Sequence, residues 1–441
     1  MKSLIVGHGG REAALGSRMA QSSALYAFMG HNNPTLTDLA NETGGKIAIG
    51  NVCDGKAITD FALVNEIDIV LVSSDDPLAS GVVDNLIHAG VKVVGPTKAG
   101  AEIEWNKAFS RKVVSEISPQ SNPSYSFVTG ISELDTALSE IGADGYVVVK
   151  PLGLTGGKGV KVVGPHLKDI TEARSYAASL LDESDNAGVI IEERIEYPEF
   201  TIQAMTDGKT VIFPPATYDY PYRFENDEGP GTGGMGSCSQ KNGLFPFLAK
   251  DVYEKACEIT YDAIQYLATH NRHFSGCMNA GFFATEAGPK VIEFNSRFGD
   301  PEAMNIMSLF DGDLIETLMS IDEKKLSDKS IRFFDKSSMV IYLVAPEYAL
   351  GISSSPREFS IDLDSIKSSN VEVFFSSSER QSTGLYKTIG TSRAVAFVVA
   401  EDSLEEARNK LEKTIGFTFQ GDLEWRKDIG LFFGGSAKPN P

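Results

Sequence analysis

The sequence predicts a protein of mixed α/β and α+β class. Its 441 residues suggest about three folding units. Short apolar runs alternate with helical patterns over the first hundred residues, which is typical of a parallel sheet covered by helices. Farther along, a glycine-rich hairpin and a second set of strand-like runs indicate α+β units.

The first hundred residues predict a Rossmann-like layer. We expect strands at 2–6, near 25–28, at 67–73 and at 91–94, with helices from about Arg11 and near 81–89. Strands that alternate with helices in this way form a parallel α/β sheet. We therefore place an N-terminal α/β substrate domain at residues 1–100.

Two further domains follow, with boundaries set by breaks in the pattern. Residues 101–118 look helical until Pro119, and a polar stretch at 327–338 ends the central segment. We expect a central core over 101–326, with a mobile lid subdomain at about 120–192, and a small α+β domain over 327–441. The strands expected in these two domains are 146–150, 160–163, 189–193, 290–294, 339–344, 371–375 and 394–399, and the helices are 169–181 and 404–414.

Composition narrows the class of function. The net charge of −20 argues against a nucleic-acid partner, which usually requires a basic face. Four scattered cysteines, Cys53, Cys238, Cys257 and Cys277, contain no C-x-x-C pair and are expected to be free thiols. The sequence has neither a signal peptide nor an apolar run of 18 residues. We expect a cytoplasmic protein with no membrane partner.

The segment GHGGRE (Gly7–Glu12) follows the first strand. Glycines at this point let backbone N–H groups approach a phosphate, and Arg11 is a candidate charge partner. The pattern is not G-x-G-x-x-G, and the second strand lacks the closing acid of dinucleotide folds, so an NAD site is not expected. An ordinary tight turn remains the alternative.

A second glycine-rich segment, VVVKPLGLTGGKGVKVV (Val147–Val163), predicts a β-hairpin with a basic tip. Lys150 and Lys158 accompany Gly153, Gly156, Gly157 and Gly159. Such a tip can fold over nucleotide phosphates and exclude water. It is not a P-loop, because no Ser or Thr follows Lys158. The alternative is a glycine-rich hairpin without a ligand.

The segment KVIEFNSRFGDPE (Lys290–Glu302) predicts a metal site. In a strand alternate residues share a face, so Val291, Glu293, Asn295 and Arg297 should point one way and Ile292 and Phe294 toward a core. Glu293 and Asn295 would then lie about 7 Å apart at Cα and offer oxygens suited to Mg²⁺. Arg297 could hold a carboxylate or phosphate bidentately. A solvated strand face is the alternative.

These segments, in this order and together with IIEERI (Ile190–Ile195), resemble the ATP-grasp superfamily. GHGGRE, GPTKAGAEIEWNKAFSR (Gly95–Arg111), GPGTGGMGSCS (Gly229–Ser239) and WRKDIG (Trp425–Gly430) are more closely similar to the glycinamide ribonucleotide synthetase (phosphoribosylamine–glycine ligase) family. The resemblance covers nearly the whole chain. It implies an ATP-grasp core of two α+β subdomains between a Rossmann-like and a small C-terminal domain.

The resemblance also implies the reaction: ATP, glycine and 5-phosphoribosylamine give glycinamide ribonucleotide, ADP and phosphate through a glycyl phosphate, a step of purine biosynthesis. ATP and Mg²⁺ (or Mn²⁺) are the implied cofactors, and the implied partners are small molecules. A monomer and a homodimer both remain open.

The site residues that the resemblance implies fall into four groups. Lys107 and Lys150 would contact the nucleotide phosphates. Glu192 and the backbone of 193–195 would hold the adenine, and Glu199 would bind the ribose. Arg297 would hold the glycine carboxylate, with Asp219 beside it. The full ATP-binding set is Lys107, Lys150, Gly156, Gly157, Lys158, Glu192, Glu193, Ile195 and Glu199. The substrate set is Gly9, Gly10, Arg11, Glu12, Asp76, Pro77, Asp219, Gly233, Gly234, Met235, Arg297, Gly299 and Asp300. The catalytic set is Arg297, Asp219 and Lys150, and the metal ligands are Glu293 and Asn295.

Several positions depart from the family pattern on the substrate side. His8, Ala13, Tyr220 and Gly231 replace the family's usual residues, whereas the nucleotide and metal residues are kept. One alternative is therefore a paralogue that ligates another amino acid or amine. The segment 278–285 also has no acid to complete a metal shell, so water or phosphate would have to do so.

Two alternatives from other classes are weaker. A non-catalytic nucleotide-binding protein would be expected to lose Lys150, Glu293 or Asn295, all of which are present. A biotin-dependent carboxylase subunit shares the fold, but the last hundred residues contain no Met-Lys-Met biotinylation site.

Overall fold

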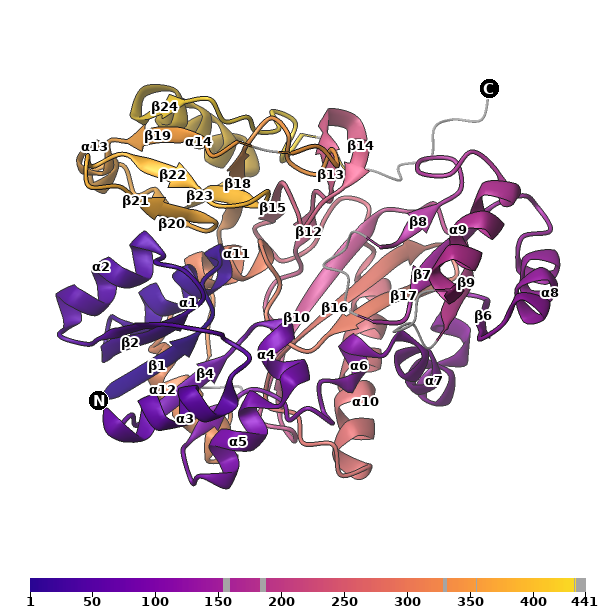
Figure 1. Ribbon diagram of the computed structural model, residues 1–441, viewed down its shortest axis with the longest axis horizontal. Coiled ribbons are helices and arrows are strands. Elements are labelled where there is room, and N and C mark those ends of the chain that lie inside the picture. Colours follow the sequence, from indigo (N-terminus) through magenta and orange to yellow (C-terminus); the bar gives the residue numbers. More distant parts are fainter. Residues whose placement is uncertain (154–158, 183–187, 328–330, 354, 432, 434–441) are drawn as a thin grey trace.

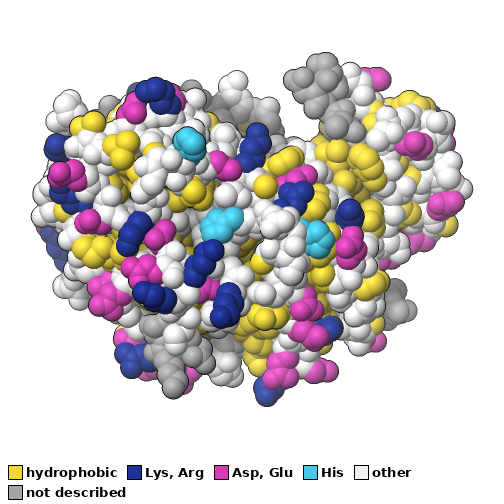
Figure 2. Space-filling view, turned by 90° about the horizontal axis from the view of Figure 1, so that it is seen from below, with side chains coloured by type: hydrophobic (Ala, Val, Ile, Leu, Met, Phe, Trp, Pro, Cys, Tyr) yellow, Lys and Arg dark blue, Asp and Glu magenta, His cyan; other side chains and the backbone are white. Residues whose placement is uncertain are grey.

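The computed structural model describes the chain except residues 154–158, 183–187, 328–330, 354, 432 and 434–441. Figure 1 shows the N-terminal sheet at the lower left, the C-terminal strands above it, and the central sheets extending to the right. On the face shown in Figure 2, acidic and basic side chains lie among one another. Within the described residues, no helix is long and apolar enough to span a bilayer.

The N-terminal region is a parallel five-stranded sheet in the order β3-β2-β1-β4-β5. Its central strands are mostly apolar because helices cover both faces, and Leu4, Ile5 and Val6 are fully buried. The Rossmann-like layer is thus confirmed. Its strands are β1 (Lys2–Val6), β2 (Ala24–Met29), β3 (Ile47–Ile49), β4 (Ile69–Val72) and β5 (Val93–Val94). Its helices are α1 (Gly10–Met19), α2 (Pro34–Thr43), α3 (Gly55–Val64), α4 (Asp75–Ser80) and α5 (Val82–His88).

Two antiparallel sheets with helices form the central region, as expected for α+β subdomains. The first, β6-β9-β7-β8, packs against α8 and α9 and contains the predicted hairpin of β7 and β8. Its elements are β6 (Tyr125–Val128), α8 (Ile131–Ile141), β7 (Val147–Pro151), β8 (Lys161–Val162), α9 (Ile170–Asp182) and β9 (Val189–Glu193). The second, β11-β10-β16-β17, packs against α10. Its elements are β10 (Glu199–Thr206), β11 (Val211–Ile212), α10 (Lys250–Thr269), β16 (Gly276–Thr285) and β17 (Gly288–Asn295).

A five-stranded sheet, β12-β15-β18-β23-β20, joins the central segment to the C-terminal strands. It places the loop between β12 and β15 beside β18 and β23. A short ribbon, β13-β14, and a sheet β21-β22-β19-β24 complete this region. The strands are β12 (Tyr218–Asp219), β13 (Tyr222–Phe224), β14 (Glu228–Gly231), β15 (Gly236–Ser239), β18 (Ser337–Val344), β19 (Glu358–Ile361), β20 (Glu372–Phe375), β21 (Ser378–Arg380), β22 (Tyr386–Thr388), β23 (Arg393–Glu401) and β24 (Phe419–Gly421). The helices are η2 (Glu225–Asp227), α11 (Glu302–Leu309), α12 (Leu314–Asp322), α13 (Leu363–Lys367) and α14 (Leu404–Thr418).

The helical pattern expected over 101–118 is confirmed, and the structure divides it into α6 (Glu102–Trp105) and α7 (Lys107–Ile117), followed by η1 (Pro119–Ser121). Asn106 is extended and its side chain accepts a hydrogen bond from Phe109 N, so it caps α7. The alternation expected in β17 is interrupted by a bulge, because Phe282 pairs with Val291 and Gly281 with Glu293. Val291 is consequently in the core and Ile292 is only half-buried.

Candidate active site

The substrate side of the site begins at the carboxyl edge of the parallel sheet. The chain leaves β1 toward β2 and leaves β4 toward β5, so the connections of these two adjacent strands diverge. A crevice forms at such a switch point, and ligands of open α/β sheets usually bind there. The loop after β1, residues 7–9, and the start of α4 meet at this crevice.

Glu12 fixes the conformation of the loop after β1. Its Oε2 accepts a hydrogen bond from Gly9 N at 2.8 Å, and its Oε1 accepts from Arg11 Nε at 2.6 Å and from the Ser74 hydroxyl at 3.0 Å. Gly7 has a φ of +128°, and a Cβ there would lie 2.6 Å from Glu12 Cγ. The structure thus places Glu12 as a buried brace of the loop, while the helix N-terminus faces the crevice.

The same loop contacts the segment after β17. Arg11 Nη1 donates to the carbonyl of Phe298 at 3.0 Å. A Cβ on Gly9 would lie 3.5 Å from Asp300 Oδ2, and a Cβ on Gly10 would overlap the Tyr342 hydroxyl. Three regions of the chain therefore converge around Gly9, Gly10 and Asp300.

Asp75 and Asp76 begin α4 at this edge. Burial opposes ionisation of Asp75, but the charges of Arg297 and Arg11 outweigh it and lower its pKa. Burial and the neighbouring Asp75 raise the pKa of Asp76. Sequence reasoning singled out Asp76 and the buried Pro77, whereas the carboxylate that faces the arginines belongs to Asp75.

A buried ion-pair network connects residues that were predicted to bind the nucleotide. Glu192 on β9 accepts from Arg111 Nε at 2.6 Å and from Arg111 Nη2 at 2.9 Å, and it pairs with Lys150 Nζ at 2.6 Å. Burial opposes the charge of Glu192, but these two cations outweigh it and lower its pKa to about 2. Burial lowers the pKa of Lys150, and Glu192 opposes that effect. Both carboxylate oxygens of Glu192 are occupied by these partners.

Arg111 also connects the two central sheets. Its guanidinium donates to the carbonyls of Val291 at 2.9 Å and Ile292 at 2.8 Å, which are the residues at the bulge of β17. The bulge thus lets one arginine on α7 hold β17 and, through Glu192, β9. Nearby, Lys107 Nζ donates to the carbonyl of Gly153 at 2.9 Å, at the end of the hairpin. Burial lowers the pKa of Lys107.

The remaining nucleotide candidates lie at the end of β9 and the start of β10. Glu193 Oε1 accepts from Ser124 N at 2.9 Å, and Ile195 is half-buried. Glu199 is accessible to solvent, yet the surrounding protein removes part of its hydration. That desolvation, with the charges of Asp227 and Glu293, raises the pKa of Glu199 to about 7. Gly156, Gly157 and Lys158 lie outside the described residues.

Glu293 and Asn295 end β17 on one face, as predicted. Glu293 is exposed, and its Oε1 accepts from Asn295 Nδ2 at 3.1 Å. Asn295 Oδ1 accepts from Arg297 Nη2 at 3.3 Å. Carboxylate and amide oxygens are the ligand types that fit a hard divalent cation. The described part of the chain contains no cluster of three acidic, histidine or cysteine ligands, so substrate or water oxygens would complete the shell.

Arg297 is almost enclosed by acidic groups. Its Nη2 lies 3.2 Å from Glu104 Oε1, and Nη1 donates to the carbonyl of Phe298 at 3.3 Å. Burial disfavours the charge, but Glu104 and Asp75 outweigh it and raise the pKa of Arg297. Its buried Nε has no hydrogen-bond partner in the described structure. A buried N–H without a partner is a candidate donor to a substrate carboxylate.

Asp219 ends β12 beside the loop 231–235. A Cβ on Gly234 would lie 2.6 Å from Asp219 Oδ1 and 2.5 Å from Pro301 Cδ. Within the described structure, the buried Oδ1 has no hydrogen-bond partner. Burial and the nearby Glu302 raise the pKa of Asp219 well above its usual value. A buried acid with an open oxygen is suited to contact a cationic or hydrogen-bond-donating substrate group.

Other predicted substrate residues support this loop. Met235 is fully buried, Gly233 N donates to the Tyr348 hydroxyl at 3.0 Å, and Gly299 N donates to Gln203 Oε1 at 3.0 Å. These residues therefore hold the two loops in position through burial and backbone hydrogen bonds.

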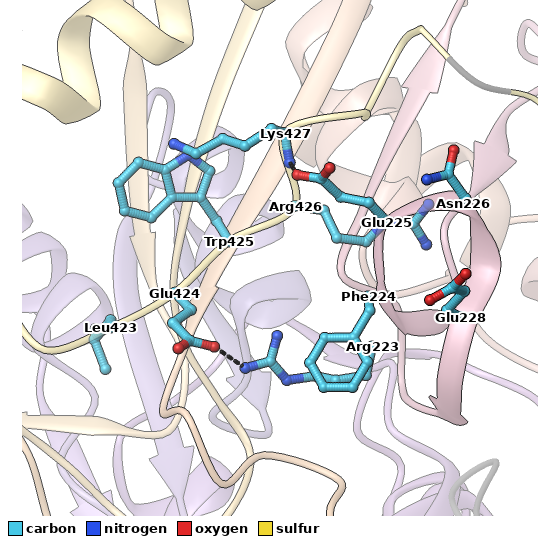
Figure 3. A pocket seen from close by; sticks show the side chains of 10 residues that line it. All are labelled: Arg223, Phe224, Glu225, Asn226, Glu228, Leu423, Glu424, Trp425, Arg426 and Lys427. Carbon is cyan, nitrogen blue, oxygen red and sulfur yellow. Dashed lines mark hydrogen bonds and ion pairs between the residues drawn. The ribbon is translucent and has the colours of Figure 1, made fainter.

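The C-terminal segment braces the turn after β13, at a pocket of about 530 Å³ (Figure 3). Arg223 pairs with Glu424 at 2.6 Å across this pocket. Arg426 donates to the Tyr222 carbonyl at 3.0 Å and pairs with Asp227 at 3.0 Å. The WRKDIG segment therefore holds the turn that follows Asp219.

Sequence reasoning missed several residues that the fold brings into the site. Glu104 and Arg111 lie in a segment that resembled the family but received no role, and the others come from elements distant in sequence. The residues missed are Glu104, Arg111, Gln203, Tyr342 and Arg393.

Solved structures from two families of enzyme share this fold. Phosphoribosylamine–glycine ligase from Thermotoga maritima matches with a TM-score of 0.80 at 20% identity, covering 97% of this chain and all of that one. A biotin carboxylase–βγ-ATP complex from Campylobacter jejuni matches with a TM-score of 0.72 at 16% identity, covering 98% and 94%. At such identities these likenesses show the fold alone.

Sequence comparison identifies the family. The phosphoribosylglycinamide synthetase N-domain model matches residues 1–104, and the ATP-grasp (A) domain model of the same enzyme matches 105–303. Phosphoribosylamine–glycine ligase of Methanobrevibacter smithii is 37% identical over 98% of this chain and 96% of its own. That of Thermococcus kodakarensis is also 37% identical, with the same coverage. The chain belongs to the phosphoribosylamine–glycine ligase family of ATP-grasp enzymes.

Proposed function

We propose that this chain joins glycine to 5-phosphoribosylamine at the expense of ATP, giving glycinamide ribonucleotide, ADP and phosphate in purine biosynthesis. The single observation that supports this most is identity of 37% over 98% of the chain to a ligase of that name. Neither relative points to another amino acid or amine, so the altered residues at His8, Ala13, Tyr220 and Gly231 need no different reaction.

ATP would lie between the two central sheets. Lys107 and Lys150 would face its phosphates, and Glu192 holds Lys150 and Arg111 in place behind them. The backbone of 193–195 would contact adenine, and Glu199 the ribose. Glu293 and Asn295 would hold Mg²⁺, or Mn²⁺, which neutralises charge on the phosphates.

Glycine would bind between Arg297 and Asp219. The Arg297 Nε–H would donate to the glycine carboxylate, and the Asp219 Oδ1 would accept from its ammonium group. A carboxylate oxygen then attacks the γ-phosphorus of ATP, and ADP leaves with the electrons of the broken P–O bond. The lysines compensate the charge that develops during this transfer.

The second step uses the crevice of the parallel sheet. There the N-terminus of α1 and Arg11 would hold the phosphate of phosphoribosylamine. Its amine attacks the carbonyl carbon of glycyl phosphate, the C–O bond to phosphate breaks, and the nitrogen loses a proton. The β7–β8 hairpin would act as the lid that keeps water from the acyl phosphate.

The reaction needs no macromolecular partner, and the chain would act in the cytoplasm as a monomer or homodimer. The test is ATP-dependent phosphate release with glycine and freshly generated phosphoribosylamine, each omitted in turn. We expect release only with both, and glycinamide ribonucleotide in equal amount. Release that requires a different amine or amino acid would refute the proposal.

A further inference from the structure

Arg393, the first residue of β23, reaches from the C-terminal strands into the substrate side of the site. Its Nη1 donates to the carbonyls of Gly233, Gly234 and Asp300, the last at 2.9 Å, and lies 3.2 Å from Asp300 Oδ1. One guanidinium thus ties together two loops, 231–235 and 299–302, that are separated by more than sixty positions in the sequence.

Tyr342 on β18 supports the same arrangement. The Arg393 guanidinium lies over the Tyr342 ring at 4.6 Å from its centroid, and the Tyr342 hydroxyl donates to Asp300 Oδ1 at 2.8 Å. The side chains of Arg393 and Asp300 are only 12% and 13% exposed. Charge-assisted contacts shielded from water in this way are the strong ones.

The two tied loops border the residues expected to contact substrate. A Cβ on Gly234 would fall between Pro301 and the Asp219 carboxylate, so the position of this loop limits the position of Asp219. On the other side, Asp300 Oδ2 lies beside Gly9 at the start of α1. In the described structure, the side-chain hydrogen bonds of Arg393 go to these loops, and none goes to Glu293 on the nucleotide side.

We propose that Arg393 is a positioning residue for the second step, which holds the 231–235 loop and Asp300 so that the amine meets the acyl phosphate. The proposal rests on the proposed function. Its consequence is selective: without Arg393 the acceptor side loosens and the contact of Asp219 with glycine weakens, while ATP binding persists and bound glycine is still phosphorylated. The glycyl phosphate then persists longer before the amine attacks, and water hydrolyses a larger fraction of it.

The test compares Arg393→Gln, Arg393→Lys and a control, Arg380→Gln, by measuring phosphate released and glycinamide ribonucleotide formed in the same samples. Arg380 lies in the same region but pairs with Asp38 at the surface. For Arg393→Gln we expect kcat/KM for phosphoribosylamine to fall at least about tenfold, as for loss of a buried charged hydrogen bond. The ratio of phosphate to product should rise above one, while KM for ATP stays within about twofold.

Arg393→Lys should recover part of the coupling, because lysine keeps the charge beside Asp300 but cannot bridge the carbonyls with a planar fork. If Arg393→Gln does not fold, Tyr342→Phe is the second variant. It removes the hydroxyl that donates to Asp300, so it should raise the ratio of phosphate to product by a smaller amount. The proposal would be overturned if the ratio of phosphate released to product formed stayed at one in all these variants. It would also be overturned if KM for ATP rose as much as KM for phosphoribosylamine. If the wild-type protein uses another amine, the proposed function fails, and the same ratio measured with that amine still decides the role of Arg393.

Discussion

Replacing Glu192 by Gln should destabilise the protein by about 3–5 kcal/mol. The substitution keeps the size of the side chain but leaves Arg111 and Lys150 as unpaired neighbouring cations in a buried site. The pKa of Glu192 gives a similar magnitude. Its decrease from 4.5 to about 2 corresponds to about 3 kcal/mol, at about 1.4 kcal/mol per pKa unit.

The assay is equilibrium urea unfolding at pH 7, with Glu193→Gln as the matched control. Glu193 is the next residue on β9 and carries the same charge. Among the described residues its side chain accepts hydrogen bonds from Ser124 at the surface, so loss of its charge should cost less than about 1 kcal/mol. If the free energy of unfolding of Glu192→Gln lay within about 1 kcal/mol of the wild-type value, the idea that this carboxylate balances two buried cations would be refuted.

The pH dependence has a definite sign. The pKa of Glu192 is lower in the folded than in the unfolded protein, so its stabilisation is fully present above about pH 4.5 and is lost as the pH falls toward 2. The difference in free energy of unfolding between wild type and Glu192→Gln should therefore become smaller in that pH window. If this difference stayed constant down to about pH 3, Glu192 would not be ionised in the folded protein as we infer.

Three further predictions concern the site. Glu293→Ala should lower turnover at least about a hundredfold with little change in Tm, since this side chain is exposed; normal phosphate release would exclude it as a metal ligand. KM for ATP should fall as pH rises through about 7, because only ionised Glu199 accepts two ribose hydroxyls, and Glu199→Gln should abolish this dependence. Gly234→Ala should lower kcat/KM at least about tenfold, because its methyl group would meet the Asp219 carboxylate. Gly243→Ala should not, because Gly243 also has a positive φ but a Cβ there would meet only Pro215 at an ordinary contact distance of 3.5 Å.

Local pattern was sufficient where neighbouring residues determine the structure. The strand at 2–6, the hairpin of β7 and β8 and strand β9 follow from apolar runs bounded by glycines. The prediction was wrong at Ile292, because a bulge depends on the partner strand and leaves little trace in the sequence of one strand. The helical pattern over 101–118 gave no sign of the break at Asn106, where a side-chain cap begins the second helix.

The sequence by itself determined the class of fold, the family and the presence of a nucleotide-type loop and a Glu-x-Asn pair. These are properties of short segments whose spacing along the chain is directly visible. Only the tertiary structure decided that Glu192 is a buried counter-ion, that Asp75 faces the arginines, and that Arg393 joins two loops. Such pairings depend on how sheets and loops distant in sequence pack together, because burial and charge act through space and not along the chain.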